Sequence, residues 1–184
     1  KDFRSIVAKF KNTTTTDAIF INTQTEPAAG HLVKELRSAK ISLSLFGHLL
    51  QGGARFLEVA GKAAEGLIFT DVPTLDTANA RVAAFLEDYK KNFGAPAGTD
   101  FYMGAAYDAL GLLVQAVEAV GNEPMKIRDY LYNLSQYDGL IGKHSFDLNG
   151  DVIGINLVFK KIKDGHIEDY REEKATTTTA TTTN

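Results

Sequence analysis

The sequence predicts an α/β fold built around a parallel sheet. Three short apolar segments, residues 17–21, 41–46 and 66–70, have the length and composition of buried parallel strands. Segments with the helical spacing of apolar residues separate them, and this alternation is typical of right-handed βαβ units. The chain has 44% hydrophobic and 23% charged residues, which is the composition of a packed globular protein.

The first part of the chain contains these units in order. A helix is predicted over residues 2–11 from its stripe of apolar side chains. Polar turn residues follow the first strand, and Pro27 is suited to the first position of the next helix. The remaining expected elements of this part are a helix over 27–38, a loop over 47–53 and a short helix over 54–60.

The character of the chain changes after residue 72. Three successive helices are predicted, over 81–93, from Asp100 to about 120, and over 126–135, so we expect the chain to enter a different lobe. Asn149-Gly150 is a strong hairpin signal, and a strand is predicted over 152–159. We therefore expect one lobe to contain 1–72 and 139–172, another to contain 73–138, and a disordered threonine-rich tail over 173–184.

Several classes of function are disfavoured by composition. The formal net charge of −3 comes from 20 basic and 23 acidic residues that are well mixed, so no basic face for nucleic acid is expected. The absence of cysteine excludes disulfides, zinc–thiolate sites and thiol catalysis. The four histidines are scattered, and neither phosphate-binding glycine motifs nor a GxSxG elbow occur. We therefore predict no cofactor, no bound metal and no enzymatic activity, and we find no apolar run that predicts a membrane span.

Polar residues follow the predicted parallel strands. In open α/β sheets ligands bind beyond the carboxyl ends of the strands, so these residues predict a site for a small polar solute. Thr25 and Asp71 are equally suited to cap helices, whereas Gln24 and His48 are not favoured caps and indicate a role in a cleft. The candidate ligand-binding residues are Thr23, Gln24, Thr25, Glu26, His48 and Asp71, with Tyr102 from the helical segment.

Five stretches together resemble one known family. They are DFRSIVAK at 2–9, DAIF at 17–20 followed by LVKELR at 32–37, AGKAAEGL at 60–67, AYDA at 106–109, and GKHSFD at 142–147 with Gly150-Asp151. In this order they resemble the leucine/isoleucine/valine-binding protein family, the type I periplasmic binding proteins of ABC importers.

The resemblance implies a protein of two hinged α/β lobes, each a three-layer structure around a parallel sheet, of which this chain is the C-terminal half. Residues 1–72 and 139–172 would belong to the C-terminal lobe, and 73–138 would be helices of the N-terminal lobe. Those helices should expose apolar surface, so an N-terminal segment or a second copy is needed to complete the fold. The resemblance further implies a membrane permease as partner and a periplasmic or extracellular location.

The identity of the solute stays open. Amino-acid-binding members of the family place an acidic residue after the glycine of the second loop, where this chain has Gly47-His48-Leu49-Leu50. Glu26 could supply that charge, or it could cap the helix that begins at Pro27. A branched-chain amino acid, a related amide, a urea-like solute and an organic acid all remain candidates. An alternative function is a sensory or regulatory ligand-binding domain of the same fold.

Overall fold

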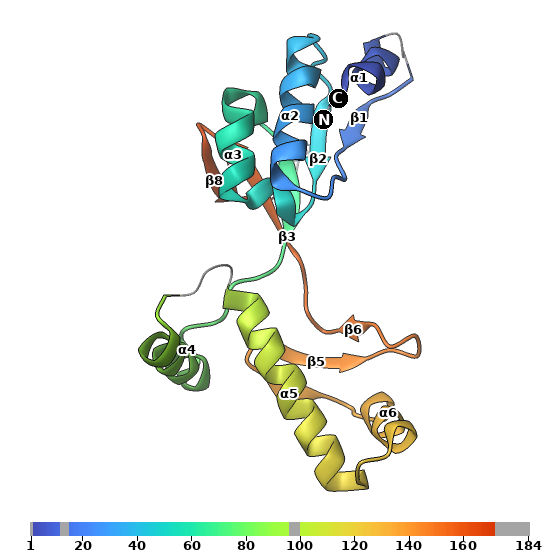
Figure 1. The fold of residues 1–184 in the computed structure, drawn as a ribbon, viewed down its shortest axis with the longest axis vertical. Helices are drawn as coiled ribbons and strands as arrows, with labels where there is room; N and C mark the ends of the chain where they lie inside the picture. The colour runs from blue at the N-terminus through green and yellow to red at the C-terminus, as the bar shows by residue number, and fades with distance from the viewer. Residues whose placement is uncertain (1, 12–14, 96–99, 172–184) are drawn as a thin grey trace, which may run out of the picture. The chain divides into compact units, whose positions relative to one another are not determined.

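The computed structural model describes residues 2–11, 15–95 and 100–171. They form two compact units, of which the first comprises the described residues 2–11, 15–71 and 158–171 and the second comprises 72–95 and 100–157 (Figure 1). The tail predicted for 173–184 lies outside the described residues. Each unit has its own sheet and its own apolar core.

The first unit alternates strands and helices, as the sequence predicts. Thr25 starts α2 as its N-cap, and Pro27 occupies its first turn. The elements of this unit are α1 (Arg4–Lys11), β1 (Ala18–Phe20), α2 (Glu26–Ser38), β2 (Ser44–Gly47), the 3₁₀ helix η1 (Leu49–Gly52), α3 (Ala54–Ala60), the 3₁₀ helix η2 (Gly61–Ala64), β3 (Ile68–Asp71), β7 (Val158–Lys163) and β8 (His166–Asp169).

The strands of the first unit form one sheet in the order β1-β2-β3-β7-β8. β1, β2 and β3 are parallel, with Phe20 beside Phe46 and Gly47 beside Phe69. β7 pairs antiparallel with β3, because β3 leads the chain out of this unit and β7 leads it back. β8 follows β7 as a hairpin. The predicted α/β fold is confirmed, with a parallel half and an antiparallel half in the same sheet.

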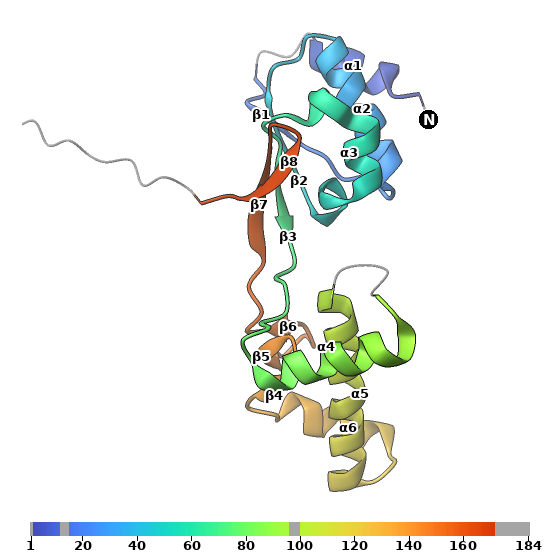
Figure 2. The same ribbon diagram turned by 90° about the vertical axis from the view of Figure 1, so that its left-hand side faces the viewer.

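Burial alternates along these strands, as expected for a sheet covered on one face. Leu45 and Phe69 are each 1% exposed and belong to the core that α2 and α3 cover. Helices α1, α2 and α3 all lie on this side of the sheet (Figure 2). The opposite face presents Phe20, Phe46 and Phe159, which are 62%, 37% and 56% exposed. The described residues of this unit thus form two layers, and the third layer expected for a complete lobe is not among them.

The second strand is shorter than predicted. It begins at Ser44 rather than at residue 41, after a turn in which Lys40 has a positive φ of 62°. The Arg37 guanidinium donates from Nη1 to the carbonyl oxygens of Ile41 (2.8 Å) and Leu43 (3.0 Å). A side chain therefore satisfies carbonyls that a longer strand would have paired with its neighbour.

The second unit contains three helices and a small antiparallel sheet of order β4-β5-β6 among its described residues. Leu75, Val82 and Leu140 form its buried core, which is much smaller than that of the first unit. Its elements are α4 (Ala80–Phe93), α5 (Asp100–Val120), α6 (Pro124–Tyr132), β4 (Tyr137–Gly139), β5 (Gly142–Phe146) and β6 (Val152–Ile153).

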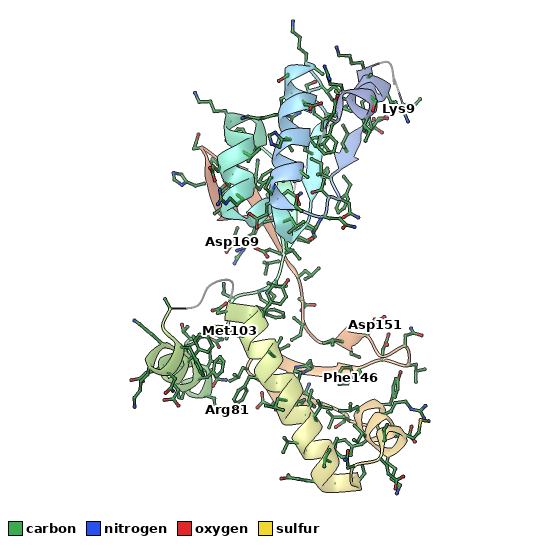
Figure 3. All side chains as sticks on the ribbon, in the orientation of Figure 1. Lys9, Arg81, Met103, Phe146, Asp151 and Asp169 are labelled. Atoms are coloured by element: carbon green, nitrogen blue, oxygen red, sulfur yellow. The ribbon has the colours of Figure 1, made fainter. Side chains whose placement is uncertain are left out.

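The return to the first unit occurs later than the expected boundary at residue 139. Residues 139–157 stay with the second unit, and the strand predicted over 152–159 is divided into β6 and β7. Gly154, which has a positive φ of 99°, lies in the break. Arg81, labelled on α4 in Figure 3, donates from Nη1 to the carbonyl oxygen of Asp138 (2.9 Å), which ties the start of the hairpin to the helices of this unit.

Helix α5 is the one described helix that is long and apolar enough to cross a membrane by length and composition. The sequence predicted no such segment. The core helix of a globular protein passes the same test. α5 carries a buried carboxylate, Asp108, that is 1% exposed and binds the β4–β5 turn. A buried carboxylate needs hydrogen-bond partners in the protein, and Asp108 has them in the β4–β5 turn. This contact indicates that α5 packs against the β4–β5 hairpin.

Candidate functional site

The carboxyl ends of β1, β2 and β3 meet at one edge of the sheet in the first unit. The amide of Ile21, just after β1, donates to the carbonyl oxygen of Phe46 on β2 (2.7 Å), which holds the two strand ends together. Six of the seven candidate residues lie at these ends: Thr23, Gln24, Thr25, Glu26 and His48 follow β1 or β2, and Asp71 is the last residue of β3. We call this group the strand-edge site. Tyr102 lies on α5 in the second unit, 49% exposed, and is not part of the group.

Two threonines shape the turn between β1 and α2. Thr25 Oγ1 accepts a hydrogen bond from the Ala28 amide (3.3 Å) as the N-cap of α2. Thr23 Oγ1 donates to the Thr25 carbonyl oxygen (3.1 Å). The capping alternative for Thr25 is thus confirmed, because its side chain satisfies an amide that the first helical turn leaves free. Gln24, between them, is exposed.

The Glu26 carboxylate is engaged in a contact that the sequence did not suggest. Glu26 is the first residue of α2, yet its Oε2 accepts a hydrogen bond from the amide of Arg55 (3.0 Å) at the start of α3. The carboxylate lies over Gly53, where any Cβ would overlap it. A carboxylate at a helix start accepts orphan amides and interacts favourably with the helix dipole. Glu26 therefore caps α3 rather than the helix beginning at Pro27.

The loop after β2 is fixed by a buried glutamine. Gln51 is fully buried and its Oε1 accepts a hydrogen bond from the His48 amide (2.6 Å). Its side chain packs against Gly47, where a Cβ would overlap the amide group. The His48 ring stacks on Phe20, with centroids 6.5 Å apart and planes 23° from parallel. The buried Nε2 atoms of His48 and Gln51 have no hydrogen-bond partner among the described residues.

Asp71 ends β3 and forms an ion pair inside the first unit. Its Oδ2 lies 3.5 Å from Nζ of Lys160 on β7, and each side chain is 22% exposed. Asp71 does not cap the next helix, α4, whose N-cap is Asn79. Gly52 lies close to the same carboxylate, since a Cβ there would stand 3.5 Å from Oδ2. The end of β3 and the loop after β2 are therefore neighbours at the strand-edge site.

Sequence reasoning missed four residues of this site: Phe20, Gln51, Gly53 and Lys160. Gln51 lies three residues after His48, the spacing at which a side chain can accept a hydrogen bond from the backbone at a helix start. This spacing could have revealed the contact between the Gln51 side chain and the His48 amide. Lys160 carried no such signal, because it meets Asp71 only through strand pairing distant in sequence.

A second polar cluster joins α5 to the hairpin in the second unit. Asp108 accepts hydrogen bonds from the amides of Leu140 (2.8 Å) and Ile141 (3.0 Å). His144 is buried nearby, with Nδ1 2.9 Å from the carbonyl oxygen of Gly142, and the Tyr137 ring meets it edge-on at 5.4 Å. Burial, together with the Asp108 charge, raises the pKa of Tyr137. Asp108 of the AYDA stretch thus binds the backbone just before the GKHSFD stretch.

No group of three or more potential metal ligands occurs among residues 2–11, 15–95 and 100–171. The second unit does contain a groove of about 440 Å³ between α4 and α5. Phe85, Tyr89, Phe93 and Tyr107 line it, with ring centroids 5.1 Å apart for Phe85 and Tyr107. The groove is aromatic, whereas the strand-edge site is polar.

Residues 1–165 match the family model described as periplasmic binding protein. A leucine-, isoleucine-, valine-, threonine- and alanine-binding protein of Pseudomonas aeruginosa is 24% identical over 153 residues, which cover 83% of this chain and 39% of that protein. The structure of a leucine-binding protein from Thermotoga maritima is similar at a TM-score of 0.68 and 24% identity, covering 92% of this chain and 48% of that one.

A solute-binding protein of an ABC transporter from R. palustris, solved in complex with benzoate, is similar at a TM-score of 0.62 and 19% identity, covering 91% of this chain and 46% of that chain. These likenesses show a shared fold. The chain spans about half the length of the relatives it matches, or somewhat less. All of these relatives are binding proteins by name.

Proposed function

Because this chain belongs to the periplasmic binding protein family, of the leucine/isoleucine/valine-binding type, we propose that it works as half of the solute-binding component of an ABC importer. It binds a small polar solute in a cleft between two lobes and carries out no bond chemistry. The observation that carries the proposal is the strand-edge site, where polar side chains gather beyond three parallel strands. The partner is a membrane permease, and the location is periplasmic or extracellular.

The solute is a branched-chain amino acid, a related amide, a urea-like compound or an organic acid. The names of the relatives support this range, since they include proteins that bind aliphatic amino acids and one solved with benzoate. Thr23, Gln24, Thr25, Glu26, His48 and Asp71 form the half of the site that this chain provides, and Tyr102 contributes from the other lobe. The Glu26 carboxylate accepts a hydrogen bond from the Arg55 amide, and Asp71 pairs with Lys160. These two contacts support a fixed position for both carboxylates at the site.

We assign the first unit to the C-terminal lobe and the second unit to the N-terminal lobe. The supporting observation for an incomplete second unit is the surface of α5. Its exposed apolar side chains are Tyr102, Tyr107, Leu110, Leu113, Val114 and Val117, each between 39% and 64% exposed. A patch of this kind marks a surface that packs against a partner.

An N-terminal segment equivalent to the other half of the relatives, or a second copy, covers the apolar face of α5 and completes the fold. A monomeric form of the 184-residue chain that melts cooperatively on its own would contradict this requirement.

Thermal-shift screening of the complete protein tests the proposed function. The panel contains aliphatic amino acids, their amides, urea and small carboxylic acids. A ligand that binds only the folded state at a hundredfold excess over its Kd stabilises it by about 2.7 kcal/mol, so a clear rise in Tm is expected for at least one member. If no solute raises Tm and a purified partner protein does, the sensory alternative replaces transport.

A further inference from the structure

We propose that Gln51 is a positioning residue of the solute site, because its buried side chain holds the backbone of His48 at the strand-edge site. This inference rests on the proposed function, and it makes solute affinity depend on a residue outside the candidate group. The hydrogen bonds of Gln51, its packing against Gly47 and the polar group that it buries carry the inference.

Gln51 binds both backbone groups of His48. Its Oε1 atom accepts a hydrogen bond from the His48 amide (2.6 Å), and its own amide donates to the His48 carbonyl oxygen (2.9 Å). These two bonds restrain the φ and ψ of His48, which are −130° and −172°. Since the backbone angles decide which side-chain rotamers are allowed, Gln51 also limits where the imidazole can lie.

The His48 ring is restrained by a second contact. It stacks on Phe20 of β1, with centroids 6.5 Å apart. The backbone and the ring of His48 are therefore held by different residues in the free chain. A group that is already ordered before binding loses less conformational entropy when a ligand arrives, so this arrangement raises the affinity for a solute that contacts His48.

The Gln51 side chain packs directly against the last residue of β2. Gly47 is buried, and a Cβ atom there would overlap Oε1, Cδ and Cγ of Gln51. The end of the strand thus limits the position of the Gln51 amide group, and that group in turn holds His48. The position of the imidazole therefore depends on two successive contacts that begin at the sheet.

Stability alone does not account for a glutamine at this position. Gln51 is fully buried, and its Nε2 atom has no hydrogen-bond partner among the described residues. A buried donor without a partner lowers the stability of a folded protein. A methionine would fill a similar space without burying this donor, but it would not bind the His48 amide. We therefore expect the two residues to differ in how they hold His48 more than in the stability that they give.

Gln51→Met in the complete protein separates positioning from stability. Calorimetric titration uses leucine, leucinamide, urea and benzoate, one probe for each candidate class of solute. For each probe that binds the unaltered protein, we expect Gln51→Met to bind about tenfold more weakly. The Tm should stay within about 3 °C of that of the unaltered protein.

The matched control is Gln136→Met, at an exposed position of the second unit, which should bind each probe as the unaltered protein does. Unchanged affinity in Gln51→Met, or a Tm that falls together with the affinity, overturns the inference.

A double-mutant cycle with Gly47 gives a second test. Gly47→Ala places a Cβ atom where the Gln51 side chain lies, so it should displace this side chain and weaken binding about tenfold. Gln51→Ala removes the atoms that the new Cβ would overlap, so we expect the double variant to bind no more weakly than Gln51→Ala alone. If the two losses multiply to about a hundredfold, the residues act independently and the inference is wrong.

The same titrations separate this inference from the proposed function. If a probe binds the unaltered protein and Gln51→Met equally well, solute binding stands and Gln51 has no positioning role. If no amino acid, amide, urea or carboxylic acid binds the unaltered protein, both are wrong.

Discussion

Replacing Asp108 with alanine is expected to lower the free energy of unfolding of the second unit by about 3 kcal/mol. The carboxylate accepts two backbone amides, those of Leu140 and Ile141, at a position that is 1% exposed. Its removal leaves both amides without a partner, and each such buried group costs about 1–3 kcal/mol. Urea denaturation followed by circular dichroism measures the loss.

Asp88→Ala on α4 is the control for this change, because Asp88 is exposed. It should change the free energy of unfolding by no more than about 0.5 kcal/mol. If Asp108→Ala is as stable as Asp88→Ala, the hairpin is held to α5 by apolar packing and the hydrogen bonds contribute little.

Replacing Phe69 with alanine is expected to destabilise the first unit by about 3–5 kcal/mol. Phe69 is 1% exposed at the centre of the sheet, and its ring lies under Gly52 of the loop after β2. The cavity left behind would therefore loosen the loop that carries His48 and Gln51. Thermal and urea denaturation measure the stability, and solute affinity should fall as well.

The control for Phe69→Ala lies on the other face of the same sheet. Phe159 on β7 pairs with Thr70 and is 56% exposed. Phe159→Ala removes the same atoms from a position where little apolar surface is buried, so it should cost far less, below about 1 kcal/mol. An equal loss of free energy of unfolding in the two variants would mean that another segment or molecule buries Phe159 under the conditions of the measurement.

The order of strands and helices could be predicted from the sequence because it depends on local patterns. The apolar runs at 17–21 and 66–70 became β1 and β3, and the hairpin signal at Asn149-Gly150 lies in the turn between β5 and β6. The predictions were wrong where a contact elsewhere decides the ends of an element. β2 starts late because Arg37 binds the carbonyls before it, and the strand expected over 152–159 is divided where the chain passes between the two units.

The position of the candidate residues at one edge of the sheet could be predicted from the sequence, but the hydrogen-bond and ion-pair partners of their side chains could not. Parallel strands put their carboxyl ends at one edge, so the residues after β1, β2 and β3 could be assigned to it from sequence. Their partners could not: Glu26 meets Arg55, and Asp71 meets Lys160, through packing of distant segments. The sequence therefore did not reveal the contacts that fix these two carboxylates, and the class of the solute stayed open.

Hydrogen exchange of the complete protein, with and without a solute that raises its Tm, tests most directly where that solute binds. The proposed site predicts slower amide exchange on binding in residues 21–26 and 48–55, which follow β1 and β2. The aromatic groove between α4 and α5 should change less. Protection confined to that groove, with no change after β1 and β2, would contradict solute binding at the strand edge.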